Sequence, residues 1–412
     1  MSLSAISFLV LAYVLVRVVI PLKTGVAVKV LLILLNIAVA FKYYILTDIW
    51  SDFSDSEAPY YLVAGLNWLY LSLLFLFVCL VVRDLFLLVA WAWTGIHIFF
   101  QADEDEIKAR KQKALVQGGT GSFAFWAAWA SLILAGFSLY GGLKEPEVRT
   151  TEIVWSQWPS DLDGMTAVQL SDLHVSPLYP QSRTQSIVEK VNALNADFIF
   201  LTGDLLDGSL EMRRKDIEPL RGLKAQYGVF GVLGNHEYYS DLEEWIWFLT
   251  REIGIRMLVN SHQVVNVQGW DIVVAGVGDS GHARRFRAKR PVADIDTALE
   301  ETPLGCPVIL LAHRPDKAAE YAKAGAGVQL SGHTHGGMIY GLKEIVARFN
   351  KGFVRGLYQV QDMILFVSPG AGMWNGFPFR LGVPSEINRL IFNSGSLGHM
   401  GIGEYFYNAG EH

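Results

Sequence analysis

The chain has 412 residues, of which 51% are hydrophobic, and carries a formal net charge of -6. This length exceeds the ~150 residues of an average domain, so we expect more than one domain. No basic tail or stripe is visible, which argues against nucleic acid as a main partner because clustered lysine and arginine bind phosphate backbones.

Hydrophobic residues are concentrated before Lys144. A helix needs about 20 mainly apolar residues to cross a bilayer. Residues 1–142 are therefore predicted to form a transmembrane helical domain. A further apolar run, 85–100, is short for a span and is interpreted as a continuation of the third helix or as an interfacial segment. The predicted spans are 3–20, 26–46, 60–82 and 122–141.

Loop charges indicate the orientation of these spans, because short cytoplasmic loops are rich in lysine and arginine. Arg17, Lys23 and Lys29 flank the first connection, loop 47–59 carries acidic residues and no base, and residues 108–113 include four bases. We therefore predict a multi-pass inner or plasma membrane protein whose large domain is extracytoplasmic. Five spans would put that domain in the cytoplasm, but they fit the charges less well.

Residues 151–395 have a different pattern, in which short apolar runs alternate with polar stretches of helical period. This alternation predicts an α/β domain with buried strands. Glycine-rich residues 396–412 are predicted to be a flexible tail. The predicted strands are 166–170, 198–202, 229–233, 272–276, 308–311, 328–330 and 364–367, and the helices include 181–194, 242–253 and 315–324.

Five of these predicted strands end directly in polar residues of metal-ligand type. Sites in α/β sheets form outside the carboxyl ends of the strands, so one crevice is expected to collect them. Each block alone has an ordinary explanation, such as a turn or a satisfied buried histidine. Together they predict a metal site. In strand order the blocks contain Asp172 and His174; Asp204 and Asp207; Asn235, His236 and Glu237; His313; and His333 and His335.

Carboxylate and imidazole ligands together favour Mn, Fe or Zn. There are more ligands than one tetrahedral ion needs, which indicates two divalent ions. Two ions about 3.5–4 Å apart clamp the attacking and leaving oxygens of a phosphoryl displacement. Such a pair needs a bridging carboxylate, and Asp204 is central in the order of the motifs.

The five blocks, in this order across 151–395, resemble the calcineurin-like metallophosphoesterase superfamily. The segments 332–337 (GHTHGG) and 376–382 (GFPFRLG) are similar to its membrane-associated or exported bacterial branch. The resemblance implies an α/β fold built as a four-layer α/β/β/α sandwich and a metal-dependent hydrolase of phosphoric esters. It does not name the substrate, because the superfamily cleaves monoesters, diesters, pyrophosphates and nucleic acids.

By matching position, the resemblance implies a role for each site residue. His236 would be the general acid or transition-state donor, Glu237 would orient it, and Asp207 would support the ligands. Arg380 is a candidate to bind a substrate phosphate through two hydrogen bonds, or else a structural ion-pair partner. One metal ion would be held by Asp172, His174 and His335, the other by Asn235, His313 and His333, with Asp204 between them.

Apolar loops at 338–341 and 373–379 pack into the core or form a rim at the membrane interface. With the predicted anchor, they favour a phosphodiester or pyrophosphate of a membrane lipid or a lipid-linked compound as substrate. The alternatives are a soluble phosphodiester or nucleotide, and a metal-binding scaffold without activity, which is disfavoured because every ligand position is filled. Asp279 is expected to form a turn or to belong to a substrate loop.

Overall fold

The computed structural model describes residues 3–42, 44, 58–99, 120–240, 242–279, 291–395 and 407–408. The chain forms two compact units. The helical unit comprises Met1–Phe53 and Ala58–Leu139, and the sheet unit comprises Ser54–Glu57 and Tyr140–His412. The last turn of the final helix, up to Leu143, therefore belongs to the sheet unit.

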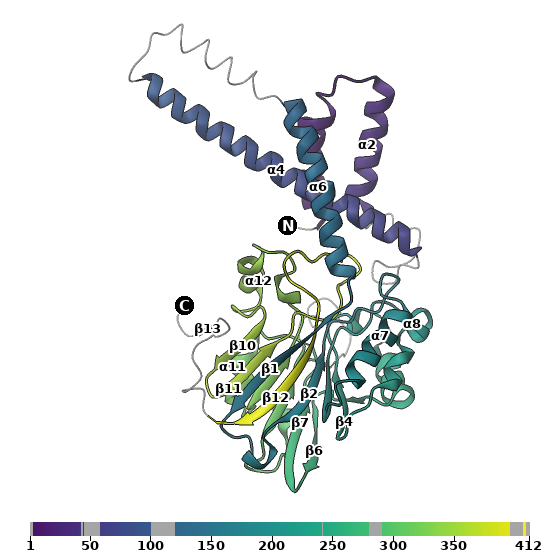
Figure 1. The fold of residues 1–412 in the computed structure, drawn as a ribbon, viewed down its shortest axis with the longest axis vertical. Coiled ribbons are helices and arrows are strands. Elements are labelled where there is room, and N and C mark those ends of the chain that lie inside the picture. Colours follow the sequence, from purple (N-terminus) through teal and green to yellow (C-terminus); the bar gives the residue numbers. More distant parts are fainter. Residues whose placement is uncertain are drawn as a thin grey trace. The chain divides into compact units, whose positions relative to one another are not determined.

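The long helices of the chain, which Figure 1 draws as ribbons, are apolar in sequence. Two segments are long and apolar enough to cross a membrane, Tyr60–Trp93 and Ser122–Leu143, and two are shorter, Ile6–Val19 and Val26–Ala40. The run at 85–100 continues the third helix as far as Phe99. Four spans and their orientation stay a prediction, because loops 45–57 and 100–119 lie outside the described residues. The helices are α1 (Leu3–Val14), η1 (Leu15–Val19), α2 (Val26–Ala40), α4 (Tyr60–Phe99) and α6 (Thr120–Leu143).

Several charged side chains among the described residues of the helical unit have partners. Arg17 lies 2.5 Å from the carboxylate of Asp84, which also accepts from Arg83 at 3.1 Å. Lys42 is fully buried and donates to Asn67. Pairing of this kind is expected of charges in an apolar bundle.

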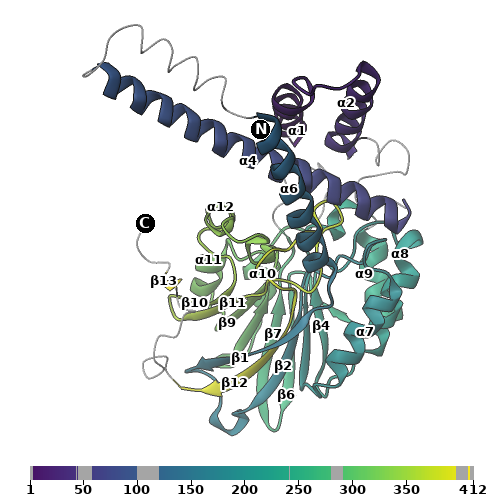
Figure 2. The same ribbon diagram turned by 45° about the horizontal axis from the view of Figure 1, so that its top comes forward.

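The sheet unit contains two mixed β-sheets (Figures 1 and 2). The first has the order β1-β12-β2-β3-β4-β5 and the second β13-β10-β11-β9-β8-β7-β6. Strands β2 to β5 run parallel, as do β7, β8, β9 and β11. The bounds are β1 Glu147–Trp155, β2 Met165–Leu170, β3 Phe198–Thr202, β4 Gly228–Val232, β5 Arg256–Met257, β6 Ser261–Val267, β7 Trp270–Gly276, β8 Val308–Leu311, β9 Val328–Ser331, β10 Gly356–Val360, β11 Met363–Val367, β12 Glu386–Ser394 and β13 Tyr407–Asn408.

Three apolar cores hold the sheet unit together. The central core lies between the sheets and includes Phe198, Phe230 and Phe366. A second core packs the first sheet against α7 and α9, and a third packs the second sheet against α10 and α11. This is the predicted four-layer α/β/β/α sandwich. The helices and helical turns are α7 (Gln181–Asn192), α8 (Leu210–Ile217), η3 (Glu218–Gly222), η4 (Glu237–Tyr239), α9 (Leu242–Phe248), η5 (Leu249–Ile253), α10 (Ile295–Leu299), α11 (Ala318–Lys323), η6 (His335–Gly337) and α12 (Lys343–Phe349), with η2 (Ser160–Leu162) after β1.

All seven predicted strands are confirmed, with ends shifted by no more than two residues. Parallel strands that are covered on both faces bury almost every residue, so their sequences are uninterrupted apolar runs. These runs therefore predicted the strands correctly. The predicted start at 151 falls inside β1, which begins at Glu147. In the predicted tail, residues 407 and 408 pair with β10, and the other residues from 396 onward lie outside the described part.

Candidate metal centre

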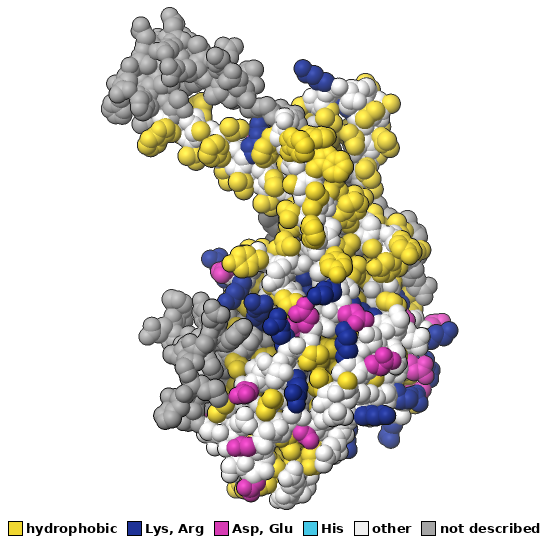
Figure 3. Space-filling view, viewed as in Figure 1, with side chains coloured by type: hydrophobic (Ala, Val, Ile, Leu, Met, Phe, Trp, Pro, Cys, Tyr) yellow, Lys and Arg dark blue, Asp and Glu magenta, His cyan; other side chains and the backbone are white. Residues whose placement is uncertain are grey.

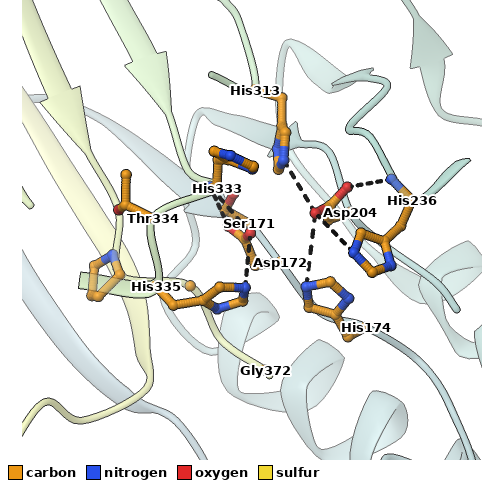
Figure 4. Close-up of polar contacts among 12 residues, drawn as sticks. Ser171, Asp172, His174, Asp204, His236, His313, His333, Thr334, His335 and Gly372 are labelled. Atoms are coloured by element: carbon orange, nitrogen blue, oxygen red, sulfur yellow. Dashed lines mark hydrogen bonds and ion pairs between the residues drawn. The ribbon is translucent and has the colours of Figure 1, made fainter. Parts of the chain in front are cut away.

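The predicted ligand residues meet at the carboxyl ends of parallel strands from both sheets (Figure 4). Strands β2, β3 and β4 lead into the Asp172, Asp204 and Asn235 turns, while β8 and β9 lead into the His313 and His333 turns. Because both sheets end at this edge, residues up to 163 positions apart in the sequence come within a few ångströms. His335 Nε2, for example, lies 3.6 Å from Asp172 Oδ1.

Ligand atoms within 4.8 Å of one another form three groups in the described part of the chain. Two of these groups match the ligand sets expected from the sequence, with two differences: the second group contains Asp204, and it lacks Asn235, which is not a residue of the His, Cys, Asp or Glu type. The third group combines the predicted donor His236 with Asp207 and His174. The groups are Asp172, His174 and His335; Asp204, His313 and His333; and His174, Asp207 and His236.

Asp204 is at the centre of the cluster. Its Oδ2 lies 3.1 Å from Nε2 of His313, 3.8 Å from Nε2 of His174 and 3.9 Å from Nε2 of His236. Its Oδ1 accepts the backbone amide of His236 at 2.8 Å. One carboxylate oxygen is therefore held by the backbone, and the other faces imidazoles from both ligand sets, as a bridging ligand requires.

The histidines are oriented for ligation through Nε2. His313 Nδ1 lies 2.8 Å from the carbonyl oxygen of Thr202, and His174 Nδ1 lies 2.9 Å from Asp207. Nε2 of His174 is buried and meets no hydrogen-bond partner among the described residues. Imidazoles fixed through one nitrogen, with the other turned into a polar cluster, are typical of metal ligands. The residues therefore fit divalent metal ions.

Five predicted site residues have left-handed backbone conformations. Their φ angles are 52° for Asp172, 47° for His174, 51° for Asp204, 69° for His333 and 48° for His335. This region is uncommon for residues other than glycine and costs of order 1–3 kcal/mol each. These conformations bend the chain sharply after β2, β3 and β9, so that side chains from these strands point to one place.

Glycine is required where these turns approach one another. A Cβ added to Gly234 would collide with the side chain of Asp204. A Cβ added to Gly332 would collide with Ser171 and Asp172. The glycine before each of these motifs is therefore a packing requirement of the site.

The ligand imidazoles differ in the direction of their pKa shifts, depending on whether a buried carboxylate lies beside them. Burial would lower the pKa of His313, but the Asp204 carboxylate outweighs it and raises the pKa to about 10. Burial, assisted by Arg314, holds the pKa of His333 well below its ordinary value, and burial does the same to His335. Burial would also raise the pKa of Asp204, yet His313 and His236 hold it well below the usual range. The bridging candidate is therefore ionised, and His333 and His335 are neutral, as ligands must be, whereas His313 would have to release its proton to bind a metal ion.

His236 is held by Asp207. Its Nδ1 lies 2.6 Å from Asp207 Oδ1, and its ring meets those of Tyr239 and Trp374 edge-on at 5.0 and 6.0 Å between centroids. Burial would lower the pKa of His236, but Asp204 and Asp207 outweigh it and raise the pKa to about 9. His236 therefore carries a proton at neutral pH in the metal-free protein.

Glu237 has a different role from the one expected. Its carboxylate accepts the backbone amides of Asp204 at 3.1 Å, Leu205 at 2.6 Å and Gly234 at 2.7 Å. The η4 turn directs this side chain into the junction of the β3 and β4 turns. The expectation that Glu237 orients His236 is therefore corrected: Asp207 does so, and Glu237 fixes the backbone beneath Asp204.

Arg380 is buried among backbone carbonyl groups, and burial lowers its pKa to about 10. These contacts fix the loop that follows β11 against the His335 turn. They are the contacts of a structural clamp, and a phosphate contact from Arg380 stays a prediction. The carbonyl acceptors belong to His335, Pro369, Gly370, Gly372 and Pro384.

Arg314 is a site residue that the sequence argument missed. Its Nε donates to Asp279 at 2.9 Å and its Nη2 to Asn235 Oδ1 at 3.1 Å. Its side chain is 24% exposed, so a positive charge borders the second ligand set. Its position directly after His313 was the available signal. Asp279, expected as a turn former or substrate-loop residue, is the buried partner of this arginine.

Comparison with known proteins places these features in a family. The profile of the calcineurin-like phosphoesterases matches residues 165–337. A transmembrane protein with metallophosphoesterase domain from Danio rerio is 34% identical over 292 residues, covering 69% of this chain and 66% of that protein. The match therefore spans slightly less than two thirds of that relative.

A bacterial relative shows the same similarity. A metallophosphoesterase of Helicobacter pylori is 34% identical over 268 residues, covering 65% of this chain and 68% of that protein. Among solved structures, the calcineurin-like phosphoesterase YfkN of Bacillus subtilis superposes with a TM-score of 0.34 at 17% identity. It covers 52% of this chain and 82% of that one.

Proposed function

Because the chain belongs to the calcineurin-like phosphoesterases, which are metal-dependent hydrolases, we propose that it cleaves a phosphodiester or pyrophosphate of a membrane lipid or lipid-linked compound. The observation that supports a lipid substrate is the contact between the last turn of the apolar helix α6 and the loop beside His236. Two relatives named as transmembrane proteins and two apolar helices indicate membrane association.

We propose that the ligand groups hold two divalent ions, of Mn, Fe or Zn type. Asp172, His174 and His335 would hold one, and Asn235, His313 and His333 the other, with Asp204 between them. Ions held by these residues would lower the pKa of water and neutralise charge on a phosphate. The donor set of carboxylate, amide and imidazole without thiolate supports these metals.

The protein side chains supply a proton and positive charge. His236, held by Asp207, can donate a proton to the leaving oxygen or a hydrogen bond to the phosphate. The Arg314 guanidinium favours an anionic group on the Asn235 and His313 side. Both groups are positioned by carboxylates, so each keeps its orientation without a substrate.

The last turn of α6 is fixed to residues 371–382, here called the active-site loop. A Cβ on Gly141 would collide with the Arg380 carbonyl, and one on Gly142 with the Pro378 carbonyl. Tyr179 donates its hydroxyl to the Gly142 carbonyl at 2.9 Å. Helix backbone and loop backbone therefore touch.

Arg183 strengthens the same joint. Its guanidinium donates to the carbonyl oxygens of Leu143 at 2.6 Å, Lys144 at 2.9 Å and Ala371 at 3.1 Å. The active-site loop also reaches the centre, where the Asn375 amide donates to Asp207 at 3.2 Å. An apolar helix thus ends on the loop that borders the proton donor, and this arrangement favours a substrate that stays in the bilayer.

Substrate preference tests the proposal. We expect the Mn-loaded enzyme to prefer an amphiphilic phosphodiester or pyrophosphate over its short-chain analogue. Phe377 is partly exposed on the active-site loop, so Phe377→Ser should raise KM for the lipid several-fold and leave bis-p-nitrophenyl phosphate hydrolysis unchanged. Kinetics in mixed micelles measure both.

Phe379 provides the matched control, because its ring packs edge-on against Phe377 at 4.8 Å but is fully buried. Phe379→Ser should lower the melting temperature and both activities, as loss of a buried aromatic costs about 3–5 kcal/mol. Equal effects of Phe377→Ser on both substrates would contradict a lipid substrate and favour a soluble phosphodiester or nucleotide.

We also propose a multi-pass inner or plasma membrane protein with its sheet unit outside the cytoplasm. The basic residues at 108–113 and at the first connection support this orientation. An alkaline phosphatase fusion after Thr150 is expected to be active. An active cytoplasmic fluorescent reporter at the same position would instead show that the sheet unit faces the cytoplasm.

A further inference from the structure

Helix α12 leaves its apolar side chains uncovered. Four of its seven residues are apolar, yet none of the seven is buried. Phe349 is 81% exposed and Ile345 55%, and Tyr340 just before the helix is 87% exposed. A helix of a water-soluble domain ordinarily packs its apolar stripe against the core. An exposed aromatic and aliphatic patch of this kind marks an interaction surface.

The same segment is basic. Residues 340–355, here called the α12 surface, carry the exposed bases Lys343, Arg348, Lys351 and Arg355 and one acid, Glu344, in a chain whose net charge is -6. Dark blue and yellow side chains gather where Figure 1 labels α12 (Figure 3). The surface therefore combines positive charge with exposed rings, a combination that fits an anionic, partly apolar partner.

The α12 surface is joined to the active-site loop. The Tyr340 amide donates to the Leu381 carbonyl at 2.8 Å, and Ile339 forms a β-bridge with Leu381. A Cβ on Gly382 would contact Tyr340 at 3.3 Å. This loop also receives the last turn of α6 at Pro378 and Arg380. The uncovered residues thus begin next to the loop that contacts the last turn of α6.

We propose that the α12 surface docks the sheet unit onto an anionic lipid bilayer. Tyr340, Ile345 and Phe349 enter the interfacial region, where aromatic side chains are favoured. The four bases contact anionic headgroups. The proposal rests on the membrane anchoring proposed above, and it assigns the bilayer contact to residues outside the metal centre.

A second copy of the chain fits this surface less well. Symmetric dimers bring the same patch of both copies together. That contact would place two sets of four bases against each other with only one acid on each side. Charge complementarity therefore favours the anionic membrane.

The test uses the full chain in nanodiscs, with Cys79 and Cys306 replaced by serine and a polarity-sensitive fluorophore on Phe349→Cys. The matched control carries the label on Leu304→Cys. Leu304 is 101% exposed and precedes β8, at the sheet edge opposite the metal centre. We expect the label at 349 to shift its emission to the blue and to be quenched by brominated lipid in discs containing phosphatidylglycerol. The label at 304 should do neither.

Charge reversal provides the second arm. Arg348→Glu with Lys351→Glu should abolish the blue shift, whereas Lys224→Glu with Arg251→Glu, at exposed positions elsewhere on the unit, should preserve it. Melting temperature and bis-p-nitrophenyl phosphate hydrolysis report folding of each variant. High salt should weaken the shift, because screening shortens the reach of surface charges.

The outcomes separate this proposal from the others. Equal emission from positions 349 and 304 in anionic discs would overturn the docking surface while leaving the hydrolase intact. A blue shift at position 349 that is independent of lipid charge but increases with the number of chains per disc would overturn the docking surface in favour of a contact between two copies of the chain. Failure of the chain to enter discs at all would refute the anchoring instead.

Discussion

Replacing Asp204 with asparagine should remove most of both metal ions. Its Oδ2 faces His313 at 3.1 Å and His174 at 3.8 Å, which belong to different ligand sets. Loss of this charge therefore weakens both sites at once. Elemental analysis after Mn reconstitution should find close to two ions per wild-type chain and well under one in the variant.

Asp172→Asn is the matched comparison, because Asp172 is expected in the first ligand set only, where its Oδ1 lies 3.6 Å from His335 Nε2. It should lower occupancy by about one ion and leave the His313 side loaded. Wild-type protein that binds one ion or none, or an Asp204→Asn variant that keeps one ion firmly, would show that Asp204 does not bridge.

The same substitution has a readout that needs no metal. Burial alone would lower the pKa of His313, and the Asp204 carboxylate raises it to about 10. Removing that charge should lower the pKa, so His313 should lose its proton at lower pH than in the wild-type protein. NMR titration of the metal-free proteins measures this shift and also reports whether the variant is folded.

The alternation of apolar runs predicted the fold well where strands are parallel and buried on both faces. Residues 198–202 and 308–311 were predicted to the residue. The same pattern did not predict β1, because charged residues such as Glu147 and Arg149 alternate with apolar ones along this edge strand. It also missed the nine-residue partner β12. Pairing between strands more than 200 residues apart leaves no local pattern to find.

The ligand cluster could be predicted because strand ends in parallel sheets share one edge. The supporting contacts could not, since they depend on which way each side chain leaves its turn. Glu237 is next to His236 in sequence but points at the backbone amides of Asp204 and Gly234. Asp207, in another motif, reaches His236 across the crevice. Sequence adjacency is a poor guide to contact when the backbone turns as sharply as it does here.

Arg380 illustrates the same limit. An arginine in a glycine-rich loop near a phosphate site is chemically suited to bind substrate. The fold buries the Arg380 side chain among carbonyl groups, including those of Pro369 and Gly372. Arg314 is the partly exposed arginine beside the ligand cluster, and it forms an ion pair with Asp279.

His236→Ala should lower kcat by about 10²–10⁴, the usual range for loss of a positioned acid or base. Metal content should stay nearly intact, because His236 is outside the two groups that match the expected ligand sets. Steady-state kinetics with Mn-loaded enzyme and parallel elemental analysis measure the two quantities. Metal loss in proportion to activity would show that His236 is a ligand and not a proton donor.

The pH profile completes this prediction. Asp204 and Asp207 outweigh the effect of burial and raise the pKa of His236 to about 9 in the metal-free protein. Nearby divalent ions lower that value, because like charge disfavours the protonated form. A proton donor is active below its pKa, so kcat/KM should fall as pH rises through it, and His236→Ala should lack this limb. Asp207→Asn should move the limb to lower pH, since it removes a carboxylate 2.6 Å from Nδ1. Glu237→Gln should lower the melting temperature and move the limb less than Asp207→Asn does, because the Glu237 charge contributes less than Asp207 to the raised pKa of His236. An unshifted limb in Asp207→Asn would contradict the assignment of Asp207 as the residue that positions the donor.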